Sequence, residues 1–137
     1  MSMRSSQNIK IAMKQEISVG TPTVIECPAT GNPFVVVFED DGRTGYFYAV
    51  DMAQERILDA MQIYNVLGVT DRHIPSVVEI GWSPDALKAG LFINQYPHAV
   101  FNFADKRGYC RAGFPPADSS WSAHTHDWDD ASVELLK

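Results

Sequence analysis

The polar segment from residue 124 to 130 holds two histidines and three aspartates within seven positions. Imidazole and carboxylate groups at such short spacing can bind zinc or another divalent cation. A site of this kind would use His124 and His126, and the third ligand would be Asp127 or, alternatively, Asp129 or a distant histidine, His73 or His98. The spacing matches no standard metal motif. The simpler interpretation is a set of helix-capping aspartates preceded by solvated loop histidines.

Four further residues have side chains that can do catalytic chemistry. His73 and His98 could each act as a general base, because imidazole titrates near neutral pH. Cys27 and Cys110 could act as nucleophiles only beside a base, and they show no CxxC spacing. We expect hydrogen-bonded or surface histidines and two semi-buried thiols instead; a disulfide between the cysteines remains open. The sequence holds no glycine-rich phosphate loop, HExxH motif, dinucleotide fingerprint or nucleophile elbow, which disfavours the common enzyme classes.

Charge and composition limit the possible partners. The 137 residues carry 17 acidic against 11 basic side chains, a net charge of -6, and 45% hydrophobic residues. Basic and aromatic side chains interleave, as in nucleic-acid binders, at Arg107, Tyr109, Arg111 and Phe114. In so acidic a chain, however, packing of the aromatic rings is the simpler explanation, and we expect no nucleic-acid partner. Acidic clusters at residues 39–41 and 127–130 ordinarily serve to keep a protein soluble, and they could also attract a basic protein partner.

The length and composition of the chain predict one folded domain spanning residues 1–137. The apolar fraction is too high for a disordered chain, and no apolar run reaches the roughly 18 residues that a membrane span needs. Residues 1–6 are small and polar, and no continuous apolar stretch typical of a secretory signal follows them. We therefore expect a cytoplasmic protein with no membrane association.

Alternating or continuous apolar residues predict most of the elements as strands. Residues 9–19 alternate in the way of a strand with one solvated face. Asp40, Asp41 and Gly42 supply the turn of a hairpin. The short connections of a three-stranded meander force its neighbouring strands to be antiparallel, and glycines inside it, Gly81 and Gly90, suggest bulges or close approach of another backbone. The expected strands are residues 9–19, 24–27, 34–39 and 46–50, and then the meander at 77–82, 87–93 and 99–103.

Residues 51–67 form the best candidate for an internal helix. Asp51 can act as its N-cap with Gln54 in the capping-box position, and Gly68 can end it. Apolar residues recur at helical spacing at 57, 60, 61, 64 and 67. Residues 63–66 could equally begin a strand, so that part stays open. After Phe103 we expect a loop pinned by aromatic residues, and then a short C-terminal helix capped by Asp127. The predicted fold class is α+β: a mainly antiparallel, twisted sheet with these two helices.

The likeness to known proteins rests on five motifs, which are GYFYAVD (45–51), ILDAMQIYNV (57–66), IGWSPD (80–85), INQYPHAVFNF (93–103) and RGYCR (107–111). Together these motifs resemble a family of small uncharacterised bacterial proteins, a domain of unknown function. The resemblance runs from Phe34 to the C-terminus and implies no established activity. The meander is also similar, more loosely, to that of small immunity proteins paired with bacterial toxins, in which Asp is more usual at the position of Asn102.

We therefore predict a non-enzymatic protein-binding module, such as an immunity-type inhibitor that occludes a toxin with an acidic, aromatic-bearing face. The alternative is a small metal-binding protein or metal-dependent hydrolase that uses zinc at His124, His126 and Asp127. The chain would be a monomer, or a homodimer that pairs exposed sheet edges. The candidate partner-binding residues are Asp40, Asp41, Arg107, Tyr109, Arg111, Trp121 and Trp128.

Overall fold

The computed structural model describes residues 9–111 together with Trp121 and Trp128. In this part of the chain, nine β-strands form two antiparallel sheets, and the sole helical element is one 3-10 turn at Val66–Gly68. The expected α+β class is therefore wrong, and the fold is nearly all β. None of the described residues belongs to a helix long and apolar enough to cross a membrane. The expected helix at Asp127 lies outside the described residues.

Each sheet is built mainly from strands that follow one another along the chain. The smaller sheet has the order β2-β3-β4-β5, and the larger has β1-β6-β7-β8-β9. All neighbouring strands are antiparallel. The strands are β1 (Lys10–Ile17), β2 (Thr23–Pro28), β3 (Phe34–Asp40), β4 (Thr44–Asp51), β5 (Arg56–Asn65), β6 (Ser76–Trp82), β7 (Lys88–Ile93), β8 (Tyr96–Asn102) and β9 (Arg107–Cys110).

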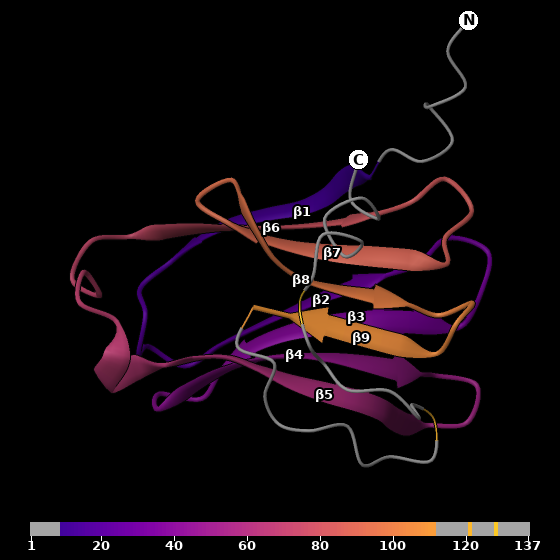
Figure 1. Cartoon of the computed structure of the whole chain (residues 1–137), viewed down its shortest axis with the longest axis horizontal. Coiled ribbons are helices and arrows are strands. Elements are labelled where there is room, and N and C mark those ends of the chain that lie inside the picture. Colours follow the sequence, from indigo (N-terminus) through magenta and orange to yellow (C-terminus); the bar gives the residue numbers. More distant parts are fainter. Residues whose placement is uncertain (1–8, 112–120, 122–127, 129–137) are drawn as a thin grey trace, which may run out of the picture.

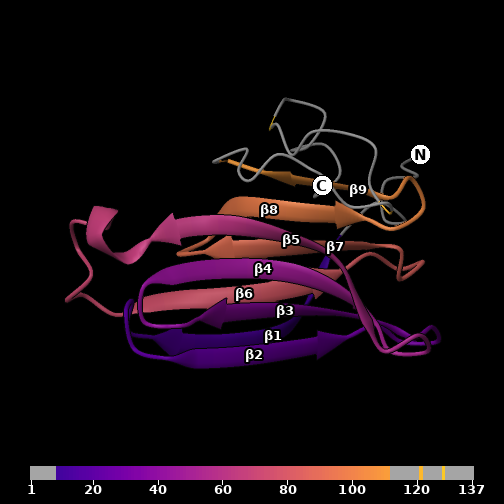
Figure 2. The same cartoon turned by 90° about the horizontal axis from the view of Figure 1, so that it is seen from below.

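The two sheets pack as layers around one hydrophobic core, with β6 and β7 on one side and β4 and β5 on the other in Figure 1. Phe47 of the smaller sheet meets Phe101 of the larger, with ring centroids 5.3 Å apart. The Trp82 indole N–H donates to the Cys27 carbonyl at 3.2 Å and so joins the layers by a hydrogen bond. At their margins the layers also approach, β1 beside β2 and β9 beside β5; Figure 2 shows β1 next to β2.

The predicted internal helix at residues 51–67 is wrong, because the segment forms a turn followed by β5. Asp51 does act as a cap, since its Oδ1 accepts from the amides of Ala53 and Gln54. Glu55 then takes a left-handed conformation (φ +51°), which a helix cannot contain, and the chain turns back along β4. Register shifts against β4 interrupt the two-residue alternation of β5. They leave inward side chains three residues apart, a spacing typical of a helix: Leu58, Met61 and Tyr64.

The other strand predictions are confirmed, with small differences. The alternation expected over residues 9–19 is broken by a register shift between Ile11 and Met13, which leaves Ile11 exposed in β1. The expected close approach at Gly81 is present, because a Cβ there would lie 2.6 Å from the Lys10 carbonyl oxygen of β1. The sequence missed β9, which pairs with β8 in the region expected to be loop.

Candidate protein-binding face

The outer face of the smaller sheet follows from the pairing of its strands. On β4, Phe47 and Ala49 point into the core, so Tyr46, Tyr48 and Val50 between them point outward. Their cross-strand neighbours share that face, since paired residues lie on the same side of a sheet. We call this set the tyrosine–acid face: Val24, Glu26, Pro28, Val35, Val37, Glu39, Tyr46, Tyr48, Val50, Ile57, Ala60 and Gln62.

Much of this face is apolar, although it faces solvent. Val24 and Ile57 are 56% and 60% exposed, while Tyr46 and Tyr48 are half-buried. Val37, which lies opposite Tyr48 on β3, is buried. An antiparallel sheet with one solvated face ordinarily carries polar side chains there. A contiguous apolar and aromatic surface on such a face is typical of an interaction site.

The charges within the tyrosine–acid face are all negative, since they come from Glu26 and Glu39. The Tyr48 hydroxyl donates to Glu39 Oε1 at 3.1 Å. The pKa of Tyr48 is raised most by burial, then by this hydrogen bond and then by the negative charges of Glu39 and Glu26. The tyrosine therefore stays protonated at neutral pH, and the face presents phenol groups beside carboxylates.

The two aspartates predicted to contact a partner at the β3–β4 turn have different surroundings. Asp40 is 1% exposed, and its carboxylate accepts from the Gly20 amide and the Tyr64 hydroxyl, both at 2.7 Å, and from the Gly42 amide at 2.8 Å. Asp41 is exposed, and its Oδ1 accepts from the amides of residues 43 and 44, which lowers its pKa. Asp40 thus holds the fold together, and Asp41 provides the exposed charge two residues beyond Glu39.

The five predicted partner-binding residues from Arg107 onward belong to the margin of the larger sheet and to the chain after it. The Arg107 guanidinium lies 4.5 Å from the ring centroid of Tyr109, which is buried. The Arg111 guanidinium lies 4.9 Å from the Trp128 ring, and its Nε donates to the Pro97 carbonyl at 2.5 Å. Trp121 meets the edge of Phe103, with centroids 5.8 Å apart. Tyr109 and Trp121 are thus packing residues, while Arg111 is exposed.

The candidate catalytic and metal-binding residues form no site within the described part of the chain. His124, His126 and Asp127 lie outside it, so the zinc site stays a prediction. Among residues 9–111, Trp121 and Trp128, no group of three His, Cys, Asp or Glu side chains could hold a metal. His73 is exposed on a loop. Burial and the positive charge of Arg111 lower the pKa of His98 to about 4, so its imidazole is neutral at pH 7.

The two cysteines are buried thiols rather than halves of a disulfide, as the sequence favoured. Burial raises the pKa of the Cys27 thiol, an effect larger than the opposing hydrogen bond with Trp82. Only the thiolate is a strong nucleophile, so burial leaves this sulfur unreactive. Cys110 Sγ donates to the Gln62 carbonyl at 3.8 Å and thereby links β9 to β5.

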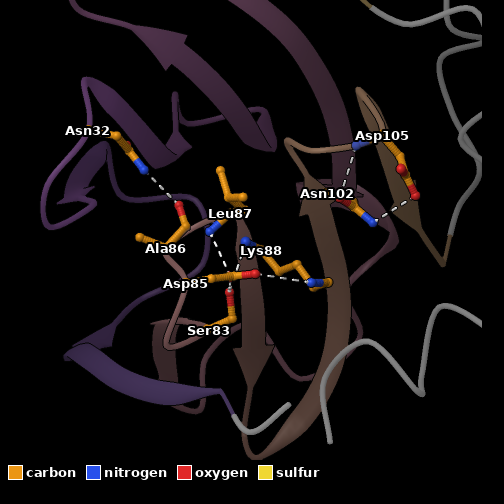
Figure 3. Close-up of polar contacts among 8 residues, drawn as sticks. All are labelled: Asn32, Ser83, Asp85, Ala86, Leu87, Lys88, Asn102 and Asp105. Carbon is orange, nitrogen blue, oxygen red and sulfur yellow. Dashed lines mark hydrogen bonds and ion pairs between the residues drawn. The ribbon is translucent and has the colours of Figure 1, made fainter. Parts of the chain in front are cut away.

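The SPD part of the IGWSPD motif builds a turn and shows no catalytic arrangement (Figure 3). The Ser83 hydroxyl donates to Asp85 Oδ1 at 2.5 Å and accepts from the Lys88 amide at 3.0 Å. Asp85 Oδ1 also accepts from the Leu87 amide, while its Oδ2 lies 3.7 Å from the Lys88 ammonium. The Ser83 hydrogen bond is the largest influence that lowers the pKa of Asp85. This motif therefore fixes the β6–β7 connection.

Comparison with known proteins confirms the family resemblance seen in the sequence and does not show the looser similarity to immunity proteins. Residues 17–137 match a family described as uncharacterised proteins conserved in bacteria (DUF2251). The chain belongs to this family. It is also 39% identical to an uncharacterised protein of Haemophilus influenzae over 124 residues, which cover 87% of this chain and 77% of that protein. No solved structure matches the chain at a significant level.

The sequence missed most residues of the tyrosine–acid face. The usable signal was the alternation over residues 45–50, in which glycine, phenylalanine and alanine alternate with two tyrosines and a valine. It became informative only when the register placed Glu39 opposite Tyr46 and Val37 opposite Tyr48. Strand pairing of this kind depends on the fold, so single-strand patterns do not reveal it.

Proposed function

We propose that this protein is a non-enzymatic protein-binding module, an immunity-type inhibitor whose tyrosine–acid face docks on a basic partner. The observation that carries the proposal is the character of that face. It combines exposed Val24 and Ile57 with two half-buried tyrosines, and its charges, from Glu26 and Glu39, are all negative. Asp41 adds an exposed carboxylate at the adjoining turn.

Each type of side chain on the face has a role in binding. Tyrosines are enriched among the residues that contribute most to protein–protein affinity, because they bury large area with little loss of side-chain freedom. Carboxylates speed association with a positively charged partner and select against acidic ones. A toxin that acts on an anionic substrate needs basic residues in its active site. A rigid, acidic, tyrosine-bearing sheet is suited to cover such a site.

Arg111 and Trp128 remain a second, smaller part of the proposed binding surface. Their cation–π contact holds the exposed guanidinium in one place, which lowers the entropy lost on binding. Arg107, Tyr109 and Trp121 support this region by packing.

The test uses the proteins encoded beside this gene. Each is expressed with this chain, the complex is purified, and its stoichiometry and affinity are measured by light scattering and titration calorimetry. We expect a basic neighbour to form a stoichiometric complex and to lose its own activity in it. The proposal is wrong if no neighbouring product binds, or if this chain turns over a substrate by itself.

A further inference from the structure

A second candidate site is a cleft of about 330 Å³ between two turns at one end of the molecule. Arg56 is the first residue of β5, directly after the β4–β5 turn, and Lys106 belongs to the turn from β8 to β9; Figure 1 shows both turns at the same end. Phe34 and Trp121 also line it. Its volume falls within the roughly 300–1,000 Å³ typical of small-molecule sites.

The lining of the cleft is positive in a chain whose net charge is -6. Arg56 and Lys106 are both exposed, and within the described residues neither lies in an ion pair. Among the lining residues that the structure describes, the one carboxylate is Asp51, which already accepts from the amides of Ala53 and Gln54. Two cations against one such carboxylate give this described part of the lining a surplus positive charge that an anion would neutralise.

The aromatic part of the cleft rests on a stack of rings. Phe34 lies parallel to Phe103, with centroids 4.4 Å apart and an interplanar angle of 16°. Phe103 also packs on Trp82 at 5.6 Å and meets the edge of Trp121 at 5.8 Å. Because Phe103 and Trp82 are buried, Phe34 and Trp121 are held in place from beneath. Fixed ring faces at the cleft favour a ligand that is itself planar and aromatic.

The backbone of Lys106 supports a role for its side chain in binding. The residue has φ +54°, a left-handed conformation in which glycine is the more stable residue. Asn102 and Asp105 hold the turn by reciprocal hydrogen bonds: the Asp105 amide donates to Asn102 Oδ1 at 3.1 Å, and Asn102 Nδ2 donates to Asp105 Oδ2 at 3.2 Å (Figure 3). The sequence thus has a lysine where the fold alone favours glycine. Strained residues of this kind cluster at functional sites.

We infer that the cleft binds a small molecule in which a planar aromatic ring carries an anionic group. The ring lies against Phe34 or Trp121, and Arg56 and Lys106 pair with the anion. Arginine can hold a phosphate or carboxylate through two parallel hydrogen bonds, and lysine adds a point charge. This site is separate from the tyrosine–acid face, and binding of a small molecule there does not depend on whether that face binds a protein.

Two aromatic anions, AMP and indole-3-carboxylate, serve as probes. Binding is followed by the shifts of the tryptophan indole N–H signals in NMR spectra, and the Trp121 signal is assigned from a Trp121→Phe variant. Adenosine and indole are the uncharged controls, and inorganic phosphate is the control without a ring. We expect at least one probe to shift the Trp121 signal and to bind at least about tenfold more tightly than its uncharged control and than phosphate.

Variants show whether the two cations carry this binding. The double variant Arg56→Gln, Lys106→Gln should bind the probe at least about tenfold more weakly than the wild type. Lys88→Gln is the matched control, because Lys88 lies at the same end of the molecule but pairs with Asp85. The Lys106→Gly variant should also bind the probe more weakly, while the melting temperature of this variant stays the same or rises. The inference is overturned if neither probe binds, if the uncharged controls bind equally well, or if the double variant retains full affinity.

Discussion

The buried carboxylate of Asp40 joins three segments that are distant in sequence. It accepts from the Gly20 amide after β1, from the Gly42 amide in the β3–β4 turn and from the Tyr64 hydroxyl of β5. A buried acceptor of three hydrogen bonds cannot be removed without leaving these donors unsatisfied. Asp40 is therefore important for stability, although its position in an acidic cluster suggested a surface role.

Replacing Asp40 should destabilise the protein more than replacing one of its donors. We expect Asp40→Ala to lower the free energy of unfolding by about 3 kcal/mol, because three donors lose their acceptor. Tyr64→Phe removes a single hydrogen bond and should cost about 1 kcal/mol. Urea unfolding measures both. Equal losses in the two variants would contradict the role assigned to the carboxylate.

His98 makes stability depend on pH in a defined window. Its pKa is about 4 in the folded protein, against an ordinary value of 6.5, because of burial and then the positive charge of Arg111. Between these values the unfolded chain binds a proton that the folded chain does not, so stability is full above pH 6.5 and falls as the pH drops toward 4. The loss between pH 7 and pH 5 should be about 1–2 kcal/mol.

A His98→Gln variant tests this prediction by urea unfolding at several pH values. The variant should lose less stability than the wild type over that range, since glutamine has no proton to gain. His73→Gln, at an exposed position, is the matched control and should keep the wild-type pH dependence. Equal pH dependence in His98→Gln and the wild type would rule out this histidine as the cause.

At the scale of elements, Gly81 fixes the approach of β1 to β6. An added Cβ would lie 2.6 Å from the Lys10 carbonyl oxygen, and backbone atoms cannot move away as a flexible side chain can. We expect Gly81→Ala to cost about 2 kcal/mol and to speed amide hydrogen exchange in β1 more than in β7. Gly68→Ala is the control, because nothing lies within 4 Å of its added Cβ. Unchanged exchange in β1 would show that the pairing tolerates the methyl group.

Local patterns predicted those strands whose alternation or apolar run is unbroken. The hairpin around residues 40–42 and the meander from residue 77 needed only an apolar segment and turn residues, and both are present. The helix prediction for the segment from Asp51 failed because the cap at Asp51 is followed by Glu55 in a left-handed conformation. Register shifts then give the inward side chains of β5 a helical spacing. The four-residue β9 has too short a pattern to predict; pairing with β8 defines it.

At the scale of the whole molecule, part of the negative charge that could steer a partner lies on one face. Glu26 and Glu39 lie on the outer face of the smaller sheet, and Asp41 extends it at the turn. The positive cleft with Arg56 and Lys106 lies where β5 begins and where β8 turns into β9. The negative surface that we propose for a protein partner is thus separate from the positive cleft that we propose for a small anion. We therefore expect variants of one site to leave binding at the other unchanged.

The affinity of the tyrosine–acid face for its basic partner tests the central claim most directly. Titration calorimetry compares the wild type with a Tyr46→Ser, Glu39→Lys variant and with a control variant, Tyr96→Ser, Glu16→Lys, whose exposed residues lie on the other sheet. We predict that the first variant weakens binding at least about 100-fold while the control stays within about threefold of the wild type. Equal affinity in all three proteins would contradict the account.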